Sequence, residues 1–204
     1  MRTTLKPANL IRSLTVCATT LLLPFSTHAA DIEITPYFGQ MISSDLTNSV
    51  DGTDLIVDGA SNYGLALAWK DSPNGQGQIL FNTVSHDFIS STDSLEHSFD
   101  VSYLHFSGVT QLKRQNYITT VSLGIGGTYI ETDNKDDIYP SITIAFGTRY
   151  ELSKSFAIVT ELRGYASYIE GDNQLFCQGT TCHALIEDSL WLEGSFSVGF
   201  AVKF

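Results

Sequence analysis

The sequence predicts an all-β fold: an eight-stranded antiparallel transmembrane β-barrel with up-and-down connections and both termini in the periplasm. Apolar residues recur at every second position over eight segments. This is the period of a β-strand, and a helical period is hard to find. The connections alternate between short and long, as in barrels that span a membrane. The last segment, SFSVGFAVKF, ends on an aromatic residue.

The predicted strands follow one another with few residues between them. In YITTVSLGIGGTY at 117–129 the odd positions are mostly apolar and the even positions mostly small or polar, and FAIVTELRGYASY at 156–168 also alternates. The strands are predicted at 31–40, 61–70, 77–86, 98–110, 117–130, 141–151, 156–169 and 189–204. Short turns are expected at 71–77, 112–116 and 152–155, and longer acidic loops at 41–60, 87–97, 131–140 and 170–188.

Residues 1–30 are predicted to be a secretory signal peptide, which leaves 31–204 as the barrel domain. The segment has three basic and no acidic residues, and its apolar run at 14–25 is followed by STHAA. A cationic start, a short apolar run and small residues at the end are typical of such signals. The run is too short to span a bilayer as a helix.

The charge balance excludes one class of partner. The chain has 11 basic and 22 acidic residues, and three of the basic ones lie in 1–30, so 31–204 carries 8 against 22, a net charge of −14. Nucleic acid is not expected as a partner, because binding phosphates along a backbone needs a basic face. No cofactor is predicted, and no metal site, because the acidic loops match no EF-hand spacing.

The second face of the predicted strands favours a barrel over a soluble β-sandwich. It carries few charges, of both signs, mixed with glycine, alanine and serine. This composition suits a narrow lumen filled by ion pairs, since eight strands leave room for little more than side chains. The residues expected in one lumen charge network are Arg149, Glu151, Glu161, Arg163 and Glu193. A narrow path for ions or small solutes is the alternative for the same residues.

Aromatic residues at the strand ends predict the edges of an apolar band. Tyr117 and Tyr129 end one strand, and Phe156 and Tyr168 end another, each pair twelve residues apart. Twelve residues of a tilted strand span roughly 30 Å along the membrane normal. The predicted aromatic girdle consists of Trp69, Tyr117, Tyr129, Tyr150, Phe156 and Tyr168.

Residues 31–204 resemble the small eight-stranded OmpA/OmpX-like outer-membrane barrels and, more narrowly, an uncharacterised proteobacterial outer-membrane β-barrel family. ELRGY (161–165) followed by a two-cysteine loop (175–182) is the most specific feature. The other features are ITPYFG (34–39), GQGQILF (75–81), YLHFSG (103–108) and the closing strand. The resemblance implies the outer membrane of a Gram-negative bacterium and says little about activity.

The end of the chain looks like the assembly signal of that family, in which the barrel assembly machinery recognises the last strand. The residues that would carry this signal are Phe196, Val198, Phe200, Val202 and Phe204. The last strand is then expected to close on the first, DIEITPYFGQ at 31–40. Closure matters because an open edge in lipid leaves backbone groups unpaired.

Cys177 and Cys182 are the two cysteines outside the predicted signal. An exported chain folds in an oxidising compartment, so we expect them to form a disulfide. The closed loop is short, and the bond is therefore expected to hold one loop in place more than to stabilise the whole chain.

His105 and Ser107 are weak candidates for catalysis. They are two residues apart and share one strand face. If the odd positions face outward with Phe99, Val101 and Tyr103, both point at lipid, as in barrel hydrolases of the lipid A deacylase type. The sequence departs from that pattern, because Gly108 follows the serine and no glutamate lies beside it on the next strand.

The predicted function is a structural or surface-interaction role through acidic extracellular loops, without enzymatic activity. The expected partners are outer-membrane lipids, lipopolysaccharide and the assembly machinery, and the sequence names no loop partner. A lipid-facing hydrolase and a narrow channel are the alternatives.

Overall fold

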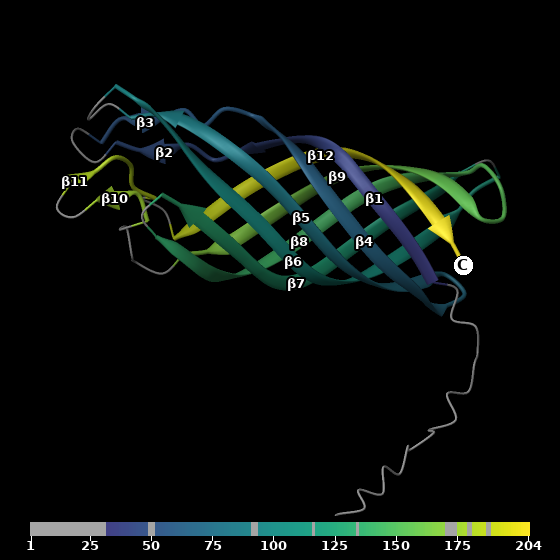
Figure 1. Cartoon of the computed structure of the whole chain (residues 1–204). Coiled ribbons are helices and arrows are strands. Elements are labelled where there is room, and N and C mark those ends of the chain that lie inside the picture. Colours follow the sequence, from purple (N-terminus) through teal and green to yellow (C-terminus); the bar gives the residue numbers. More distant parts are fainter. Residues whose placement is uncertain are drawn as a thin grey trace, which may run out of the picture.

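The fold is a closed β-barrel, seen in a computed structural model that describes residues 32–48, 52–90, 94–115, 117–133, 135–169, 175–178, 181–186 and 189–204. The predicted signal peptide at 1–30 lies outside them. The barrel strands are ordered β1–β4–β5–β6–β7–β8–β9–β12, and β12 closes on β1 (Figure 1). The predicted eight-stranded antiparallel barrel is confirmed. In this described part, no helix is long and apolar enough to cross a membrane.

Antiparallel pairing joins each barrel strand to its two neighbours. The strands are Ile32–Ser43 (β1), Ala60–Ser72 (β4), Gly75–Ile89 (β5), Glu96–Lys113 (β6), Ile118–Thr132 (β7), Asp136–Glu151 (β8), Phe156–Tyr168 (β9) and Leu190–Lys203 (β12). Two small hairpins pair Leu46–Thr47 (β2) with Asp54–Leu55 (β3), and Cys177–Gln178 (β10) with Thr181–Cys182 (β11).

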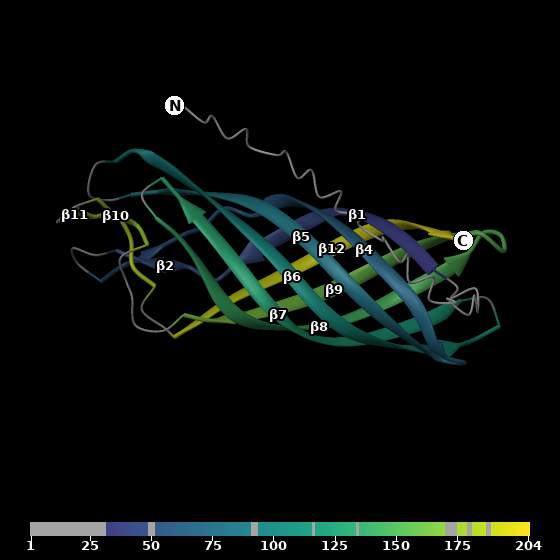
Figure 2. The same cartoon turned by 60° about the horizontal axis from the view of Figure 1, so that its bottom comes forward.

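The two ends of the barrel differ. At the turn end, the connections 73–74, 114–117 and 152–155 are short, and the amide of Phe204 donates to the carbonyl of Ile32 at 2.9 Å. At the loop end, the connections 44–59 and 169–189 carry the two hairpins (Figures 1 and 2). The barrel therefore begins and ends at the turn end. That this end faces the periplasm stays a prediction.

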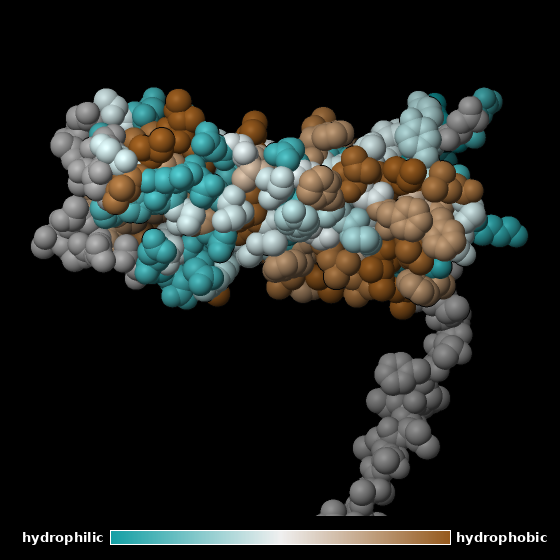
Figure 3. Space-filling model, turned by 45° about the horizontal axis from the view of Figure 1, so that its top comes forward, coloured by the Kyte–Doolittle hydropathy of each residue, from teal (hydrophilic) through white to brown (hydrophobic). Residues whose placement is uncertain are grey.

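The outer surface of the barrel changes character along its axis. Next to the turn end, a band of exposed apolar side chains surrounds the strands, and we call this band the lipid belt (brown in Figure 3). It includes Leu65, Leu104, Phe106, Leu123, Ile144, Phe146, Leu162, Phe196 and Val198. Next to the loop end, β5, β6 and β7 carry outward polar side chains, among them Ser85, Asp87, Ser98, Asp100 and Glu131. On β1 and β12, the apolar residues Ile42, Leu190 and Leu192 stay exposed up to the loop end. The belt is the part of the surface that fits the hydrocarbon of a bilayer.

The interior changes in the opposite sense. Within the lipid belt the lumen contains buried polar and charged side chains such as Thr143, Arg149 and Arg163. It also contains a small apolar cluster, made of Tyr37, Ala66, Leu80, Ala157, Val159 and Ala201. Toward the loop end it becomes a buried apolar cluster, which we call the cap core. Its members are Met41, Leu46, Leu55, Val57, Val84, Phe88, Phe99, Val101, Tyr103, Ile130, Tyr139, Tyr165, Ile169, Leu175, Phe176, Ala184, Ile186 and Trp191. The loop half therefore packs like a water-soluble protein, and the turn half like a membrane barrel.

Strand β6 shows why the lipid-facing orientation considered for His105 and Ser107 is wrong. Both side chains are buried in the lumen, and the exposed residues of this strand segment are Leu104 and Phe106. Phe99 and its odd-numbered neighbours suggested an outward face because they are apolar. Phe99, Val101 and Tyr103 lie on the loop side of the lipid belt, in the cap core. The odd-numbered residues therefore point inward along the whole of β6.

The long loop expected at 131–140 is also wrong. Strands β7 and β8 continue to Thr132 and from Asp136, and only residues 133–135 connect them. The strand ends were hard to recognise because Glu131 and Asp136 lie on the loop side of the lipid belt. There the outward residues face water, and the apolar alternation that marks a strand is lost. The loop predicted at 87–97 is shorter for the same reason, since β5 reaches Ile89 and β6 starts at Glu96.

The change of polarity along the outer surface predicts different effects of arginine at two heights. Leu123→Arg places a charge in the lipid belt, where 64% of the leucine side chain is exposed. We expect it to lower the free energy of unfolding in lipid by about 2–4 kcal/mol. Ser98→Arg, outward in the loop half, is expected to cost at most about 1 kcal/mol. Reversible denaturant unfolding in liposomes measures both. Equal losses would show that the belt does not end where the surface becomes polar.

Candidate functional site

The lumen begins, at the turn end, with a buried ion-pair group. Arg149 on β8 donates from Nη1 and Nη2 to the two carboxylate oxygens of Glu33 on β1, each at 2.6 Å. Its Nε donates to Oε1 of Glu151 at 2.7 Å, and Lys203 on β12 donates to Oε2 of the same carboxylate at 2.7 Å. Bidentate pairs of this kind are strong and fix the geometry of both side chains. The group links three strands across the lumen.

A second group lies further along the lumen, on strands β8 and β9. Arg163 donates from Nε to Glu161 at 2.8 Å and from Nη1 to the hydroxyl of Thr143 at 3.2 Å. Next to it, Asn82 donates to the hydroxyl of Tyr165, the next inward residue of β9, at 2.7 Å and accepts from Asn62 at 3.1 Å. The middle of the barrel thus contains polar side chains linked by hydrogen bonds, while Nη2 of Arg163 and Oδ1 of Asn62 have no hydrogen-bond partner among the described residues.

A third group lies directly below the cap core and contains an acidic residue with no arginine beside it. Glu193 on β12 accepts a short hydrogen bond from the hydroxyl of Tyr103, and its Oε1 lies 2.7 Å from Nε2 of His86. Nδ1 of His86 lies 3.1 Å from the carbonyl oxygen of Asp58. The ring of Tyr103 stacks on Tyr165, with 4.0 Å between the ring centroids. A carboxylate can remain buried here because both of its oxygens have partners.

The five residues predicted as one lumen network all lie on the inner side of the barrel, but the structure divides them among these three groups. Arg149 and Glu151 belong to the first, Glu161 and Arg163 to the second, and Glu193 to the third. The groups are separate because the register between strands sets the height of each side chain. Glu193 pairs in register with Tyr165, one inward position beyond Arg163.

Several residues of these groups were not among the predicted site residues, among them Glu33, His86 and Tyr103. Glu33 could have been found, because it alternates with Ile32 and Ile34 at the start of the first predicted strand. His86 and Tyr103 give no comparable signal. Each is recognised only when the sheet register brings it to the height of Glu193.

Loop residues seal the cap core. Leu46 from β2, Phe176 beside β10 and Ile186 all pack into it, together with Trp191 from the barrel wall. Phe176 meets Phe88 and Phe99 edge to face, with centroids 5.4 and 5.3 Å apart. The loop end is thus closed by a packed apolar layer, and the turn half by ion pairs.

The predicted disulfide between Cys177 and Cys182 is confirmed. It joins β10 to β11, whose residues 177 and 182 are paired in register. Phe176, the residue before the first cysteine, inserts into the cap core. The disulfide therefore holds the β10–β11 hairpin together directly after Phe176, which helps to close the loop end of the barrel.

His105 and Ser107 make no hydrogen bond to each other, because the hydroxyl of Ser107 has no hydrogen-bond partner among the described residues. Nε2 of His105 lies 2.9 Å from the hydroxyl of Ser141 on β8, and its side chain is fully buried. The ring packs near Tyr103 and Tyr165, with centroids 5.8 and 5.6 Å away. A nucleophile and its base need an opening toward substrate. This pair is enclosed among lumen side chains.

The predicted girdle residues face outward at two heights. Trp69, Tyr117, Tyr150 and Phe156 lie near the turn end, where Tyr117 and Tyr150 are neighbours with centroids 6.4 Å apart. Tyr168 and Tyr129 lie on the loop side, and Tyr129 donates to Asp136 at 3.1 Å. Both positions are at strand ends, and their contact with a membrane surface stays a prediction.

The three phenylalanines at the end of the chain face outward. Phe196, Val198 and Phe200 are exposed on β12 within the lipid belt, and Phe204 is exposed at the turn end. Val202 is half-buried and pairs in register with Ile34 of β1. A role of these five residues in assembly remains an expectation.

The barrel is similar to solved outer-membrane proteins at low sequence identity. Neisserial surface protein A is 10% identical with a TM-score of 0.54, over 85% of this chain and 97% of that chain. Ail of Yersinia pestis, in complex with the heparin analogue sucrose octasulfate, is 14% identical with a TM-score of 0.48, over 85% and 99%. The N-terminal barrel domain of Pseudomonas aeruginosa OprF is 12% identical with a TM-score of 0.46, over 84% and 98%. No family model and no curated protein matches the sequence.

The chain has the fold of the small outer-membrane β-barrels. Its lipid belt and the match to Neisserial surface protein A agree with the outer membrane as its location. At these identities the likeness shows the fold alone. The narrower resemblance to an uncharacterised proteobacterial family stays a prediction. Within the described residues, no group of three or more histidine, cysteine, aspartate or glutamate side chains could hold a metal ion.

The ion-pair group at the turn end predicts a strong difference between single and double variants. Arg149→Met leaves the buried carboxylate of Glu33 without its bidentate partner. We expect the free energy of unfolding to fall by about 3–5 kcal/mol, because the remaining charge is uncompensated. Arg149→Met combined with Glu33→Gln is expected to recover most of the loss.

Denaturant unfolding of the single and double variants measures this difference. The matched control is Lys203→Met, which removes a half-exposed partner of Glu151 and is expected to cost at most about 1 kcal/mol. A double variant no more stable than Arg149→Met would show that the pair contributes through packing and not through charge.

Proposed function

We propose that the protein is a closed outer-membrane barrel that presents a rigid, acidic loop end to partners outside the cell. The observation that carries the proposal is the cap core. Loop residues and barrel residues share one buried apolar cluster, so the described loop surface is held in one arrangement before any partner arrives. A preorganised surface binds without the entropic cost of ordering its loops.

The sealed lumen supports a role at the cell surface and argues against a role in transport. Charged and polar side chains bond to one another through the turn half, and apolar side chains close the loop half. An ion that entered would meet paired charges and then an apolar layer, and neither replaces its hydration shell. The burial of His105 and Ser107 likewise argues against a hydrolase that uses these two residues on a lipid-facing surface.

The charges of the loop end suggest the chemistry of the partner. Asp100, Glu131 and Asp136 are direct register neighbours on β6, β7 and β8, and all three are exposed on the outer face. We call them the acidic row. Lys135 is the one lysine or arginine among the described residues of the loop end. Like charges that face each other across strands are destabilising, which favours a cationic partner, such as a basic protein surface.

Conductance separates the proposed role from a channel. We expect the purified protein in a planar bilayer to produce no openings above the protein-free baseline, because both halves of the lumen are filled. A general porin in the same bilayer verifies that openings would be detected. Reproducible openings that disappear when the protein is heat-unfolded would contradict the proposal.

The acidic row predicts opposite effects of one substitution on stability and on binding. Glu131→Gln removes the central charge, and we expect the free energy of unfolding to rise by about 0.2–1 kcal/mol at low salt. The same variant is expected to bind less well to a poly-lysine biosensor surface. Asp71→Asn removes an equal charge at the turn end, where the residue is exposed. An equal loss of binding in both variants would mean that the net charge acts and not the loop end.

A further inference from the structure

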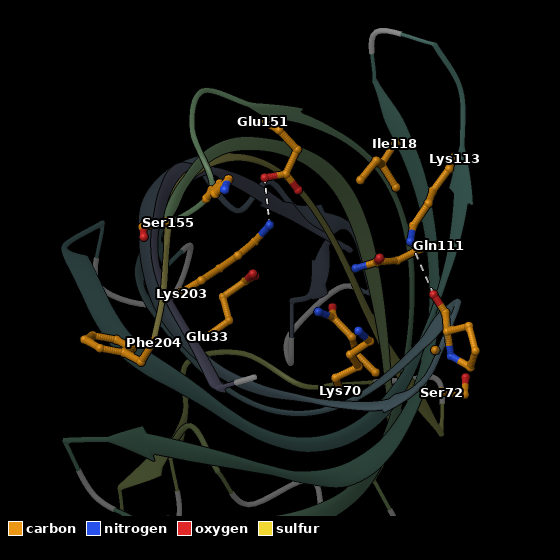
Figure 4. Close-up of a pocket in the computed structure, with 14 residues that line it drawn as sticks. Glu33, Lys70, Ser72, Gln111, Lys113, Ile118, Glu151, Ser155, Lys203 and Phe204 are labelled. Carbon is orange, nitrogen blue, oxygen red and sulfur yellow. Dashed lines mark hydrogen bonds and ion pairs between the residues drawn. The ribbon is translucent and has the colours of Figure 1, made fainter. Parts of the chain in front are cut away.

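The turn end contains a cavity that the proposed function does not use. Its volume is about 390 Å³, and its lining residues come from β1, β4, β5, β6, β7, β8, β12 and the connections 73–74 and 152–155. Figure 4 shows Lys203 of β12 and Gln111 of β6 reaching from different strands toward the middle of the opening. We call this cavity the turn-end mouth. The first ion-pair group, with buried Glu33 and Arg149, lies beside it.

Lysines outnumber carboxylate side chains in the turn-end mouth. Lys70, Lys113, Lys154 and Lys203 line it, against two carboxylate side chains. In a chain with a net charge of −11, this concentration of cations is unexpected. It is also local, because the loop end is acidic.

The two glutamate side chains do not pair with Lys113 or Lys154. Both oxygens of Glu33 accept from Arg149 at 2.6 Å, and Glu151 is shared between Arg149 and Lys203 at 2.7 Å each. Lys113 donates to the neutral carbonyl oxygen of Pro73 at 3.4 Å, and Lys154 is exposed on the connection 152–155. Lys113 and Lys154 therefore bring positive charge to the mouth that neither glutamate neutralises.

We propose that the turn-end mouth binds a phosphate group. Its lysines come from separate elements, so they surround a ligand and do not lie along one edge. A phosphate offers three acceptor oxygens to such an arrangement, and lysine binds it as a point charge. The amides of Gln76 and Gln111 and the hydroxyl of Ser155 line the same cavity and add neutral donors.

The phosphate group has two possible sources. The mouth opens at the ends of strands that cross the lipid belt, so the headgroup of an anionic phospholipid in the adjacent leaflet can reach it. A soluble phosphomonoester presents the same chemistry. Because exposed charges are screened within about 10 Å at 0.1 M salt, binding from either source is expected to weaken as salt rises.

The test measures binding of two probes to the full barrel in a neutral detergent. The first probe is glycerol 3-phosphate, followed by calorimetry. The second is phosphatidylglycerol against phosphatidylcholine, followed by native mass spectrometry of the retained lipid. We expect at least one probe to bind, and Lys113→Gln and Lys154→Gln each to weaken binding about tenfold, as for the loss of one charged hydrogen bond.

The matched control is Lys135→Gln, which removes the same charge at the loop end, where Lys135 pairs with Asp137 at 2.9 Å. It is expected to leave binding unchanged. Binding of the lipid alone assigns the site to a headgroup, binding of glycerol 3-phosphate alone to a soluble ligand, and binding of both to the phosphate group itself. Binding of neither probe, or an equal loss with Lys135→Gln, would overturn the proposal. Shift of the folded band on unheated gels verifies that each variant folds.

Discussion

The whole structure depends on backbone pairing in a medium without water. In lipid, each unpaired amide or carbonyl group of a strand costs several kcal/mol, so the sheet has to close. It closes where β12 pairs with β1, from Glu33 with Lys203 to Ser43 with Glu193, with a break at Thr35 and Pro36. Closure with eight strands makes the lumen narrow. A narrow lumen has to be filled by side chains that satisfy one another. The pairing of Arg149 with Glu33 is thus a consequence of barrel size as much as of charge.

The second constraint is that the barrel is longer than its lipid belt. In the turn half the outer surface contacts lipid, and the polar side chains lie inside. In the loop half the outer surface contacts water, so the apolar side chains move inside and form the cap core. One strand can carry both patterns without changing its register, as β6 does with Phe99 and His105 on the same inward face. The crossover lies near Tyr103, whose hydroxyl bonds to Glu193 and whose ring joins the cap core.

These constraints decide which features could be predicted from the sequence. Strand number, closure and the disulfide were accessible, because alternation and the cysteine pair are local signals. The inward direction of His105 could not be predicted. An apolar residue indicates that its face of the strand points toward lipid if it lies in the turn half of the strand, but toward the cap core if it lies in the loop half. The partner of Arg149 was equally inaccessible: Glu33 lies 116 positions away along the chain. Their contact follows from the register of the closed sheet.

The distribution of charge is the feature that stability does not explain. Opposite charges pair inside the barrel, yet each end keeps an excess of one sign: lysines around the turn-end mouth and the acidic row at the loop end. Exchanging a few of these residues would allow pairing at both ends. Exposed charges contribute little to the free energy of unfolding. Stability therefore neither excludes these excesses nor requires them. The two proposals assign each excess to a ligand that approaches that end: a cationic surface at the loops, and a phosphate at the turns.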